Sequence, residues 1–411
     1  MKSVDQHLDD ILATVEPLHP LDLQLMEARN CLIAEDVVAP VTLPAFDNAA
    51  MDGYAVSSED LAEASDDAPV SLPVIGDIPA GSQQPLAIRP GMCARIMTGA
   101  PVPPGADAVV PVEWTDAGLA KVSIARAPAP GSHIRRSGED VAAGDTVLYA
   151  DEPLTAARLG LVAAMGLERV RVRPRPRVVV ISTGSELVEP GQRPDSGQIT
   201  DSNSYLLTAC AIDVGCVAYR VGIVPDDPRT LLAMLEDQLI RADAVVCSGG
   251  VSKGAYDVVK EVLGRLGTVK FEEVAMQPGK PQGFGTLGSD NTPIFALPGN
   301  PVSTFVSFQV FVRPALTKMM GIGARRLRMV RATLDGRVLS ARNRRQFARG
   351  LLVRRGSISH AVTPVGGHGS HLMGGLARAN CFIVLPEDVT EVHAGGSVDC
   401  MIFDEHGLEK T

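Results

Sequence analysis

Three acidic residues in the middle of the chain are candidates for binding a metal ion. Glu186 lies in STGSELVEPG, Asp226 in VPDDP and Asp257 in SGGVSKGAYD, and each segment follows an apolar run typical of a buried strand. Mg²⁺ is commonly held in proteins by one or two carboxylates together with substrate oxygens. We therefore predict that Glu186, Asp226 and Asp257 are metal ligands and that the metal is Mg²⁺.

The loops that carry these acids, and a fourth loop LPGNPVS at 297–303, are also rich in small and hydroxyl-bearing residues. Glycine lets a ligand approach the backbone, and the N–H groups at the start of a helix attract anions. Lys280, in MQPGKP, can add a positive charge. The predicted phosphate-binding residues are Ser182, Thr183, Gly184, Ser248, Gly249, Gly250, Ser252, Gly299 and Asn300. Because carboxylates beside phosphates repel unless a divalent cation lies between them, these loops predict a polyphosphate or pyrophosphate substrate bound with Mg²⁺.

Several of these residues also have a structural interpretation. Asp257 stands where a helix is expected to begin, and the helix dipole favours an acid there. A proline follows Asp227 and suits the first position of a helix, so Asp227 is the expected N-cap and Asp226 is left available for binding. Asn300 also precedes a proline and has the same capping pattern. Glu186 has no helix signal behind it, which favours a functional role.

Strands and helices are expected to alternate in the region that contains these loops. Apolar strands are predicted at 177–182, 216–224, 243–247 and 293–297, and helices at about 202–212, 228–241, 256–266 and 301–318. Strands separated by helices of this length predict a doubly wound, mostly parallel α/β sheet. Ligands bind such a sheet at the carboxyl ends of its strands, so all four loops are expected to face one crevice.

Two further helices and a linker are predicted outside this sheet. Apolar residues recur at helical spacing over 4–18, where Ser3 and Gln6 are spaced as a capping box. The segment TAARLGLVAAMG at 155–166 predicts a second helix. We interpret RVRVRPRPR at 169–177 as an exposed linker, because its arginines alternate with valine and proline.

Two regions are expected to be rich in β-structure. From about 45 to 136 the sequence consists of short apolar runs split by proline and glycine. Short strands such as MVRATL, GLLVRR, CFIVLP and SVDCMIF return from about 327 to the end. The first region predicts a small β-rich domain, and the second predicts a small barrel.

The composition excludes several kinds of partner. A formal net charge of −10 opposes binding to nucleic acid or to an anionic membrane. The seven cysteines are odd in number and lie mostly in apolar segments, which indicates buried thiols in a reducing compartment. The amino terminus lacks the pattern of a signal peptide, and no run of about 18 apolar residues predicts a membrane span. We expect a cytoplasmic protein.

Other chemical motifs are weak in this sequence. GFGTLG at 283–288 matches GxGxxG, but it does not join an apolar strand to a helix, so we do not interpret it as a dinucleotide-binding loop. His368 and His371 are the only close pair of histidines, which is too little to predict a zinc site. No GxSxG segment supports a serine nucleophile. The phosphate-binding loops remain the main candidate site.

Seven segments stand in order along the chain and together carry a family resemblance. They are DNAAMDGYAV (47–56), RIMTGAPVPPGAD (95–107), RRSGED (135–140), STGSELV (182–188), CSGGVSKGAYD (247–257), MQPGKP (276–281) and LPGNPVS (297–303). Their types and spacing closely resemble the MoeA family of molybdopterin molybdenumtransferases, which is similar to the E domain of gephyrin. The resemblance extends from about residue 5 to residue 405.

The resemblance implies a homodimer whose subunit has four domains. An elongated, discontinuous linker domain would comprise 1–44 and 137–174, and it would flank an inserted β-rich domain at 45–136. An α/β molybdopterin-binding domain would follow at 175–326, and a C-terminal β-barrel domain at 327–411.

The implied reaction joins molybdenum to molybdopterin. The substrates would be molybdate and adenylylated molybdopterin, whose phosphoanhydride is cleaved with release of AMP to give molybdenum cofactor. Mg²⁺ is the implied activator, and a molybdopterin adenylyltransferase is an implied partner. Two alternatives stay open, a pterin-binding scaffold without turnover and the molybdopterin adenylyltransferase itself, although the five intact acids disfavour the first and the additional β domains disfavour the second.

The family's motif positions fall on specific residues of this chain. They are the carboxylates Asp52, Asp140, Glu186, Asp226 and Asp257, together with Thr98, Lys280, Pro298, Pro301 and Ser370. Asp52 and Thr98 lie in the inserted β-rich domain, so the resemblance implies that this domain, from the other subunit, closes over the crevice. A turn-forming role beside Gly53 is the structural alternative for Asp52.

One position departs from the family pattern. Gln277 stands where many relatives carry a basic residue ahead of PGKP. The change removes one phosphate contact and is expected to leave Lys280 as the sole nearby cation, with a consequence for affinity more than for reaction type.

Overall fold

The computed structural model describes residues 1–83, 86–250, 258–265, 268–355, 359–405 and 408 of the chain. The chain divides into two compact units. One unit consists of Met1–Leu21 and Val172–Thr411, and the other of Asp22–Arg171.

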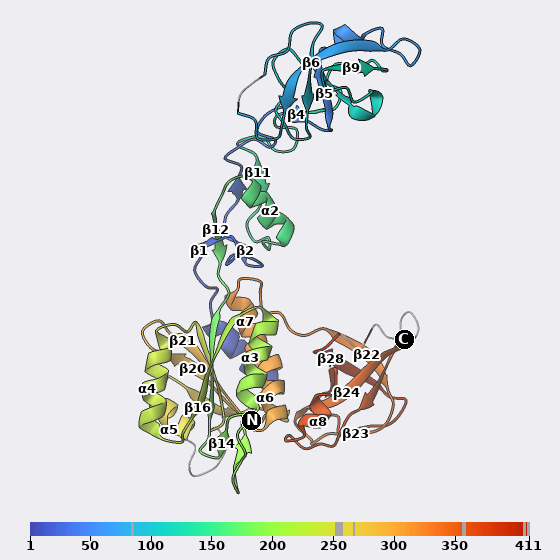
Figure 1. The fold of residues 1–411 in the computed structure, drawn as a ribbon. Helices are drawn as coiled ribbons and strands as arrows, with labels where there is room; N and C mark the ends of the chain where they lie inside the picture. The colour runs from blue at the N-terminus through green and yellow to red at the C-terminus, as the bar shows by residue number, and fades with distance from the viewer. Residues whose placement is uncertain (84–85, 251–257, 266–267, 356–358, 406–407, 409–411) are drawn as a thin grey trace. The chain divides into compact units, whose positions relative to one another are not determined.

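The larger unit contains a six-stranded mixed sheet (Figure 1). Its strands, in spatial order, are β16 (Val217–Val224), β13 (Arg177–Thr183), β17 (Ala244–Ser248), β21 (Thr292–Leu297), β20 (Pro281–Leu287) and β18 (Lys270–Glu273). The first four are parallel to one another, β20 runs antiparallel to β21, and β18 runs antiparallel to β20. The four predicted strands are therefore confirmed, whereas β18 and β20 were not predicted.

Helices cover both faces of this sheet because its central strands are apolar on both sides. Val178 and Val180 of β13 pack with α1 (Val4–Thr14), α3 (Asn203–Val214), α6 (Pro301–Ser307) and α7 (Arg313–Met319) in one cluster. Val179 and Ile181 of the same strand pack with α4 (Pro228–Leu239) and α5 (Val258–Arg265) in another. A π-helical turn, Phe308–Val312, joins α6 to α7. The doubly wound arrangement predicted for this region is thus present.

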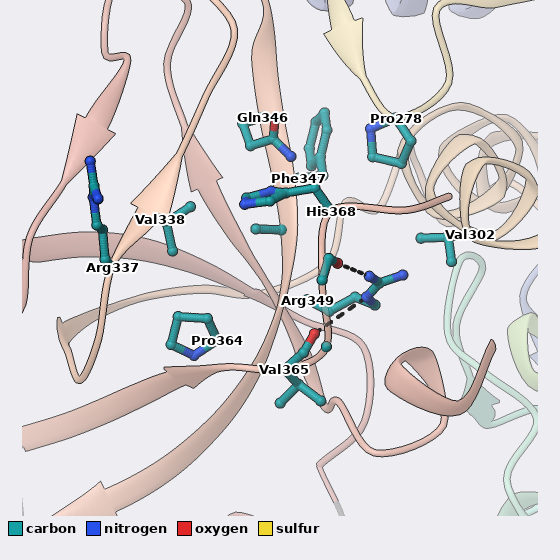
Figure 2. A pocket seen from close by; sticks show the side chains of 13 residues that line it. Pro278, Val302, Arg337, Val338, Gln346, Phe347, Arg349, Pro364, Val365 and His368 are labelled. Carbon is teal, nitrogen blue, oxygen red and sulfur yellow. Dashed lines mark hydrogen bonds between the residues drawn. The ribbon is translucent and has the colours of Figure 1, made fainter. Parts of the chain in front are cut away.

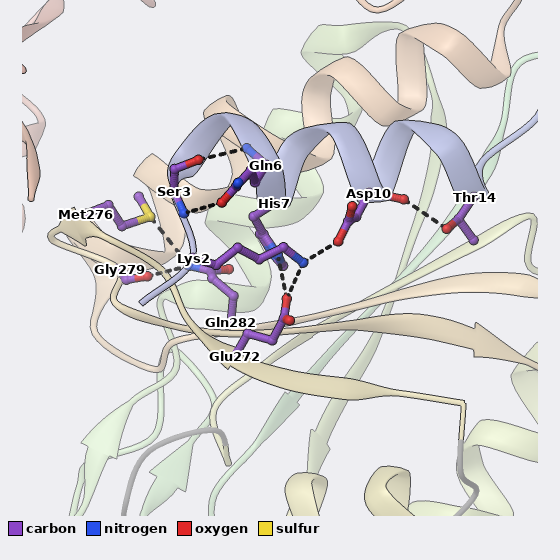
Figure 3. Close-up of polar contacts among 10 residues, drawn as sticks. All are labelled: Lys2, Ser3, Gln6, His7, Asp10, Thr14, Glu272, Met276, Gly279 and Gln282. Carbon is purple, nitrogen blue, oxygen red and sulfur yellow. Dashed lines mark hydrogen bonds and ion pairs between the residues drawn. The ribbon is translucent and has the colours of Figure 1, made fainter.

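The first helix is fastened to the sheet by a polar cluster (Figure 3). Ser3 and Gln6 form the predicted capping box, because the Ser3 hydroxyl accepts the Gln6 N–H at 3.1 Å and the Gln6 side chain accepts the Ser3 N–H at 3.3 Å. Lys2 contacts Glu272 of β18 at 2.6 Å and also pairs with Asp10. The amino terminus of the chain is therefore held at the β18 side of the sheet.

A closed five-stranded barrel follows the α/β sheet in the same unit. Its strands are β24 (Arg345–Arg355), β25 (Ser359–Pro364), β22 (Met329–Leu334), β28 (Ser397–Ile402) and β26 (Cys381–Leu385), and pairing of β26 with β24 closes it. β19 (Met276–Gln277) adds to β24 in parallel, so the chain between β18 and β20 contacts the barrel. The barrel predicted for this region is confirmed by these pairings.

The smaller unit is rich in β-structure, as expected. Its five-stranded sheet has the order β8 (Ala108–Pro111), β5 (Gly53–Val56), β7 (Cys93–Ile96), β6 (Val70–Ile78) and β9 (Lys121–Ile124). The two-stranded pairs are β10 (Ile134–Arg135) with β4 (Asn48–Ala49), and β11 (Thr146–Leu148) with β3 (Val37–Val38). The second predicted helix is α2 (Ala156–Ala164).

The interpretation of 169–177 as an exposed linker is wrong over its first half. Residues Arg169–Arg173 form β12, the middle strand of a sheet with β1 (Leu21–Gln24) and β2 (Leu32–Ile33). Val170 and Val172 are buried, and Arg171 pairs with Asp22 at 3.1 Å. The alternation of arginine and valine is therefore the period-two pattern of a strand with one buried face.

All seven cysteines are buried, and none forms a disulfide. Among the helices that the structure describes, none has the length and apolar character that crossing a bilayer requires.

Candidate functional site

The carboxyl ends of β13, β17 and β21 meet at one edge of the sheet. Ser182 of β13 lies opposite Ser248 of β17, which in turn lies opposite Leu297 of β21. The three loops that follow these residues therefore leave from the same edge, as the sequence predicted. We call this side of the sheet the carboxyl edge.

Glycines bring two of these loops into direct backbone contact. Gly249 has a φ of +99°, and a Cβ atom there would lie 2.6 Å from the Thr183 carbonyl oxygen. A Cβ at Gly299 would lie 3.5 Å from the Cα of Gly249. Gly250 also has a positive φ, of +65°. The glycines at this edge therefore let the loops after β13, β17 and β21 pack backbone against backbone.

Glu186 and Asp226 both contact the turn at Gly184–Ser185. A Cβ at Gly184 would lie 2.6 Å from a carboxylate oxygen of Glu186. Asp226 accepts the Ser185 N–H at 3.1 Å, and its own N–H donates to the Ser185 hydroxyl at 3.2 Å. Both carboxylates are exposed, and neither pairs with a cation in the described part of the chain. Two unpaired carboxylates on one turn suit a divalent cation.

The third predicted metal ligand, Asp257, lies outside the described residues, and so does Ser252. Within the ranges that the structure describes, no group of three or more His, Cys, Asp or Glu side chains is arranged to hold a metal ion. Of the three predicted metal ligands, the structure describes Glu186 and Asp226, and the metal site stays a prediction.

The two capping predictions have different outcomes. Asp227 is the N-cap of α4, since its carboxylate accepts the Thr230 N–H at 2.8 Å and the Thr230 hydroxyl at 2.7 Å, and these bonds lower its pKa. Asn300 occupies the N-cap position of α6, but its side chain makes no capping hydrogen bond. The Asn300 side chain is exposed, so it is available at the carboxyl edge.

Lys280 lies at the same edge because β20 runs antiparallel to β21. The register Gly283 with Ala296 places the start of β20 beside the end of β21. The Lys280 amine is 3.0 Å from Glu273, so its charge is partly compensated. Arg344 approaches the Gln277 side chain at 3.5 Å. The expectation that Lys280 is the sole cation near Gln277 is therefore wrong, because a barrel residue distant in sequence also contributes one.

Ser370 is brought to α6 by the barrel. Its carbonyl oxygen accepts the Val302 N–H at 3.0 Å, next to Pro301 at the first turn of the helix. Pro298 is also close, because its carbonyl accepts the Thr304 hydroxyl of the same helix. The structure thus brings Ser370 close to Pro298 and Pro301, which lie far from it in the sequence.

A buried arginine holds the loop that carries Ser370 (Figure 2). Arg349 is only 5% exposed, and its guanidinium donates to the carbonyl oxygens of Val365, Gly367, Gly369 and Leu372. Burial lowers its pKa, and it has no carboxylate partner among the described residues. It lines a pocket of about 70 Å³ together with Pro278 and Val302 from the α/β part and Gln346 and His368 from the barrel. A buried cation that is hydrogen-bonded to carbonyl oxygens but has no described carboxylate partner keeps its net charge, and a pocket beside it favours an anionic ligand.

In the smaller unit, Asp52 and Thr98 form a pair. One Asp52 oxygen accepts the Thr98 N–H at 2.7 Å and the Thr98 hydroxyl at 2.8 Å, and the backbone bond followed by the hydroxyl bond lowers the pKa of Asp52. The carboxylate therefore contacts a distant loop and makes no local turn with Gly53. Gly53 is required instead by the approach of β8, since a Cβ there would lie 1.9 Å from the Val110 carbonyl.

Asp140, the other predicted site residue of this unit, is exposed, and its backbone N–H donates to the Leu43 carbonyl at 3.2 Å.

Two residues at the carboxyl edge were missed by the sequence analysis. Asp201 is buried and accepts hydrogen bonds from the hydroxyls of Ser182, at 3.1 Å, and Ser204, at 2.5 Å. Asn203, at the start of α3, donates to the Ser248 hydroxyl at 2.7 Å and to the Gly299 carbonyl at 2.6 Å. The only sequence signal was their place at the start of the predicted helix at 202–212, with Asp201 just before it and Asn203 in its first turn, in ITDSNS.

The family models and the relatives that match this chain agree on one protein family. Three family models match the chain: the MoeA N-terminal region (domain I and II) at 2–166, a probable molybdopterin binding domain at 179–318, and the MoeA C-terminal region (domain IV) at 331–403. A Mycobacterium tuberculosis protein named molybdopterin molybdenumtransferase 2 is 47% identical over 96% of this chain and 98% of its own length. A Haemophilus influenzae molybdopterin molybdenumtransferase is 36% identical over 98% and 99%.

Solved structures agree with these relatives. A crystal structure of a molybdopterin biosynthesis MoeA protein from Pyrococcus horikoshii superimposes with a TM-score of 0.73 at 31% identity, and covers 98% of this chain and 99% of that chain. The similarity therefore includes the α/β sheet, the barrel and the smaller unit in a single alignment. The chain belongs to the MoeA family.

Proposed function

We propose that this protein is a molybdopterin molybdenumtransferase that transfers molybdenum from molybdate to adenylylated molybdopterin and releases AMP. The full-length relatives with this name support the reaction class. The observation that carries the proposal is that Glu186 and Asp226 contact one turn, have no cationic partner among the described residues, and lie at the edge where Gly249 packs against Thr183. A pyrophosphate-linked substrate fits this combination, because its oxygens would contact both the amides and the cation held by the acids.

In this proposal Glu186 and Asp226, with Asp257, hold Mg²⁺, which when bound neutralises the charge that develops on the leaving phosphate. The residues of the chain orient the anhydride. Backbone amides near Gly249 and Gly299 bind its phosphates, and the hydroxyls of Thr183 and Ser248 add polar contacts. Lys280 contributes a positive charge that Glu273 holds in position.

The pocket beside Arg349 is the proposed place for an oxyanion substrate such as molybdate. Arg349 supplies a positive charge that no described carboxylate neutralises, and it fixes the loop that presents Ser370 to the start of α6. Pro298 and Pro301 shape the backbone on the other side. A fully ionised oxyanion would offset the buried charge of Arg349.

We further propose that the active form is a cytoplasmic homodimer with the four-domain division given above. In it, Asp52, Thr98 and Asp140 of one subunit complete the site of the other. The Asp52–Thr98 pair supports this, because its carboxylate stays ionised and exposed. A molybdopterin adenylyltransferase would supply the adenylylated substrate.

The decisive experiment compares two adjacent acids. Asp226→Asn is expected to lower AMP release by about 100-fold or more when adenylylated molybdopterin, molybdate and Mg²⁺ are present, because it removes a metal ligand. Glu186→Gln should have a similar effect. Asp227→Asn is the matched control, since asparagine caps a helix as well as aspartate does. It should keep the wild-type rate.

Three results would contradict the proposal. Equal rates for Asp226→Asn and Asp227→Asn would remove the metal site from the described turn. Tight pterin binding without AMP release, with every metal tried, would indicate a binding scaffold. Consumption of ATP with molybdopterin would indicate an adenylyltransferase.

A further inference from the structure

Asn203 occupies a central position at the carboxyl edge. It is the first residue of α3, and its amide nitrogen donates to the Ser248 hydroxyl at 2.7 Å and to the Gly299 carbonyl at 2.6 Å. These two partners follow β17 and β21, so the Asn203 side chain joins two of the loops proposed to bind phosphate. Ser248 itself is only 2% exposed.

The hydrogen bonds fix which way the amide points. In the opposite orientation the Asn203 oxygen would face the Gly299 carbonyl, and two acceptors would repel. The oxygen Oδ1 therefore points away from Gly299. Oδ1 is buried, and it has no hydrogen-bond partner among the described residues.

A buried acceptor without a partner costs about 1–3 kcal/mol, so it calls for an explanation. Phosphate and molybdate oxygens are themselves acceptors and cannot satisfy it. Mg²⁺ prefers carboxylates, and Asn203 makes no hydrogen bond to an acidic side chain within the described ranges. The complement is a donor, which is either an ordered water or an N–H or O–H group on the organic part of a ligand, and only the ligand donor would make affinity depend on the ligand's chemistry.

We propose that Asn203 is a specificity-determining residue whose Oδ1 accepts a hydrogen bond from an N–H or O–H group of the substrate. This inference rests on the proposed function, because that function brings a ligand with both phosphates and donor groups to the carboxyl edge. The donor belongs either to the pterin ring or to the nucleotide. Asn203 thus distinguishes a pterin nucleotide from a bare polyphosphate.

The test measures dissociation constants of three probes for the wild-type protein and Asn203→Ala, in the presence of Mg²⁺. The probes are molybdopterin, AMP and inorganic pyrophosphate, of which only pyrophosphate has no N–H group. One lost neutral hydrogen bond corresponds to a loss of about 3- to 10-fold in affinity. We expect this loss for molybdopterin if the donor is in the pterin, or for AMP if it is in the nucleotide, with pyrophosphate affinity unchanged.

A structural role for Asn203 would weaken all three probes equally, and that result overturns the proposal. A change confined to the Mg²⁺ concentration needed for binding also overturns it, because it would make Oδ1 a metal ligand. Asn203→Asp retains an oxygen acceptor, so it should keep more of the preference over pyrophosphate than alanine does, and it provides the test if Asn203→Ala does not fold. The dissociation constants do not depend on turnover. If the wild-type protein released no AMP, the proposed function would be contradicted, but the wild type and Asn203→Ala could still be compared for their affinity to the three probes.

Discussion

The two edges of the α/β sheet differ in whether their charged side chains form ion pairs. At the amino ends of the strands, Arg177 and Asp243 form a two-pronged ion pair, with distances of 2.8 and 3.0 Å, and the Arg177 backbone N–H adds a third bond at 2.7 Å. At the carboxyl ends, Glu186 and Asp226 have no cationic partner among the described residues. The sheet therefore has a neutralised pair at its amino edge and, among the described residues, acids without cationic partners at its carboxyl edge.

This difference separates structural charges from charges available to a ligand. A paired, partly buried carboxylate contributes to stability, whereas an unpaired acid on a turn contributes little and remains free to bind. The close backbone contact of Gly249 with Thr183 also lies at the carboxyl edge. The comparison predicts that substitutions at the carboxyl edge change activity and that those at the amino edge change stability.

After the loss expected for Asp226→Asn, the largest effect is expected for Gly249→Ala at the carboxyl edge. Its φ of +99° is unfavourable for alanine, and the new Cβ would lie 2.6 Å from a carbonyl oxygen that cannot easily move. The strain of about 1–3 kcal/mol is relieved by moving the loop that is proposed to bind phosphate. We expect kcat/KM for AMP release to fall by about 10- to 100-fold, measured beside the thermal unfolding midpoint.

Gly160→Ala in α2 is the control for this substitution. A Cβ at Gly160 meets nothing within 4 Å, so alanine should stabilise the helix by about 0.5–1 kcal/mol. AMP release should be unchanged. Wild-type kinetics for Gly249→Ala would show that the carboxyl edge does not depend on this close approach.

A smaller effect, on stability, is expected for Asp243→Ala at the amino edge. The Asp243 side chain is 17% exposed but that of Arg177 is 48% exposed, so solvent screens the pair. We expect a loss of about 1–2 kcal/mol in the free energy of unfolding, smaller at high salt, with kcat unchanged at temperatures where the variant is folded. Urea unfolding at two salt concentrations measures the loss in free energy of unfolding and its dependence on salt.

Asp66→Ala provides the comparison for an exposed pair. Asp66 and Arg126 are 3.9 Å apart with side chains 77% and 58% exposed, and such pairs contribute about 0–1 kcal/mol. A fall in kcat for Asp243→Ala without a fall in stability would break the distinction between the two edges.

The parts of the fold that were predicted from sequence are those that local patterns determine. The four apolar strands and the helices between them were recognisable because both faces of the sheet are buried. The cap at Asp227 was recognisable because a proline follows it. In 169–177 the valines alternate with arginines, which is the pattern of a strand. The arginines and prolines instead led to the interpretation as a linker.

The parts that were missed depend on contacts between distant segments. No strand was predicted for β20, which carries Gly283 and Gly285, yet a Cβ at Gly285 would lie 2.4 Å from the Thr268 carbonyl. These glycines therefore permit close packing within the sheet. Arg349 and Asn203 belong to no chemical motif, and their importance comes from burial and from partners 16 to 96 residues away. No local pattern in one sequence encodes such contacts.

The smallest predicted effect concerns His7, away from both edges, in the cluster shown in Figure 3. His7 is 3% exposed, packs edge-to-face on Phe311 at 4.8 Å, and lies 3.3 Å from Glu272. Burial, followed by the charge of Lys2, lowers its pKa, although Glu272 and Asp10 oppose this shift. The folded protein therefore holds His7 neutral at pH values where the unfolded chain, with a histidine pKa of about 6.5, already binds a proton.

The sign of the pH dependence follows from that difference in proton binding. Above about pH 7 His7 is neutral in both states and contributes no pH dependence, but as the pH falls below about 6.5 the unfolded state gains a proton first and stability declines. His7→Gln cannot titrate, so its free energy of unfolding should change less than that of the wild type between pH 7 and pH 5, as followed by urea unfolding. Exposed His19→Gln is the matched control and should keep the wild-type dependence. An identical decline in all three proteins would assign the acid sensitivity to the carboxylates around Lys2, leaving His7 as a packing residue of α1.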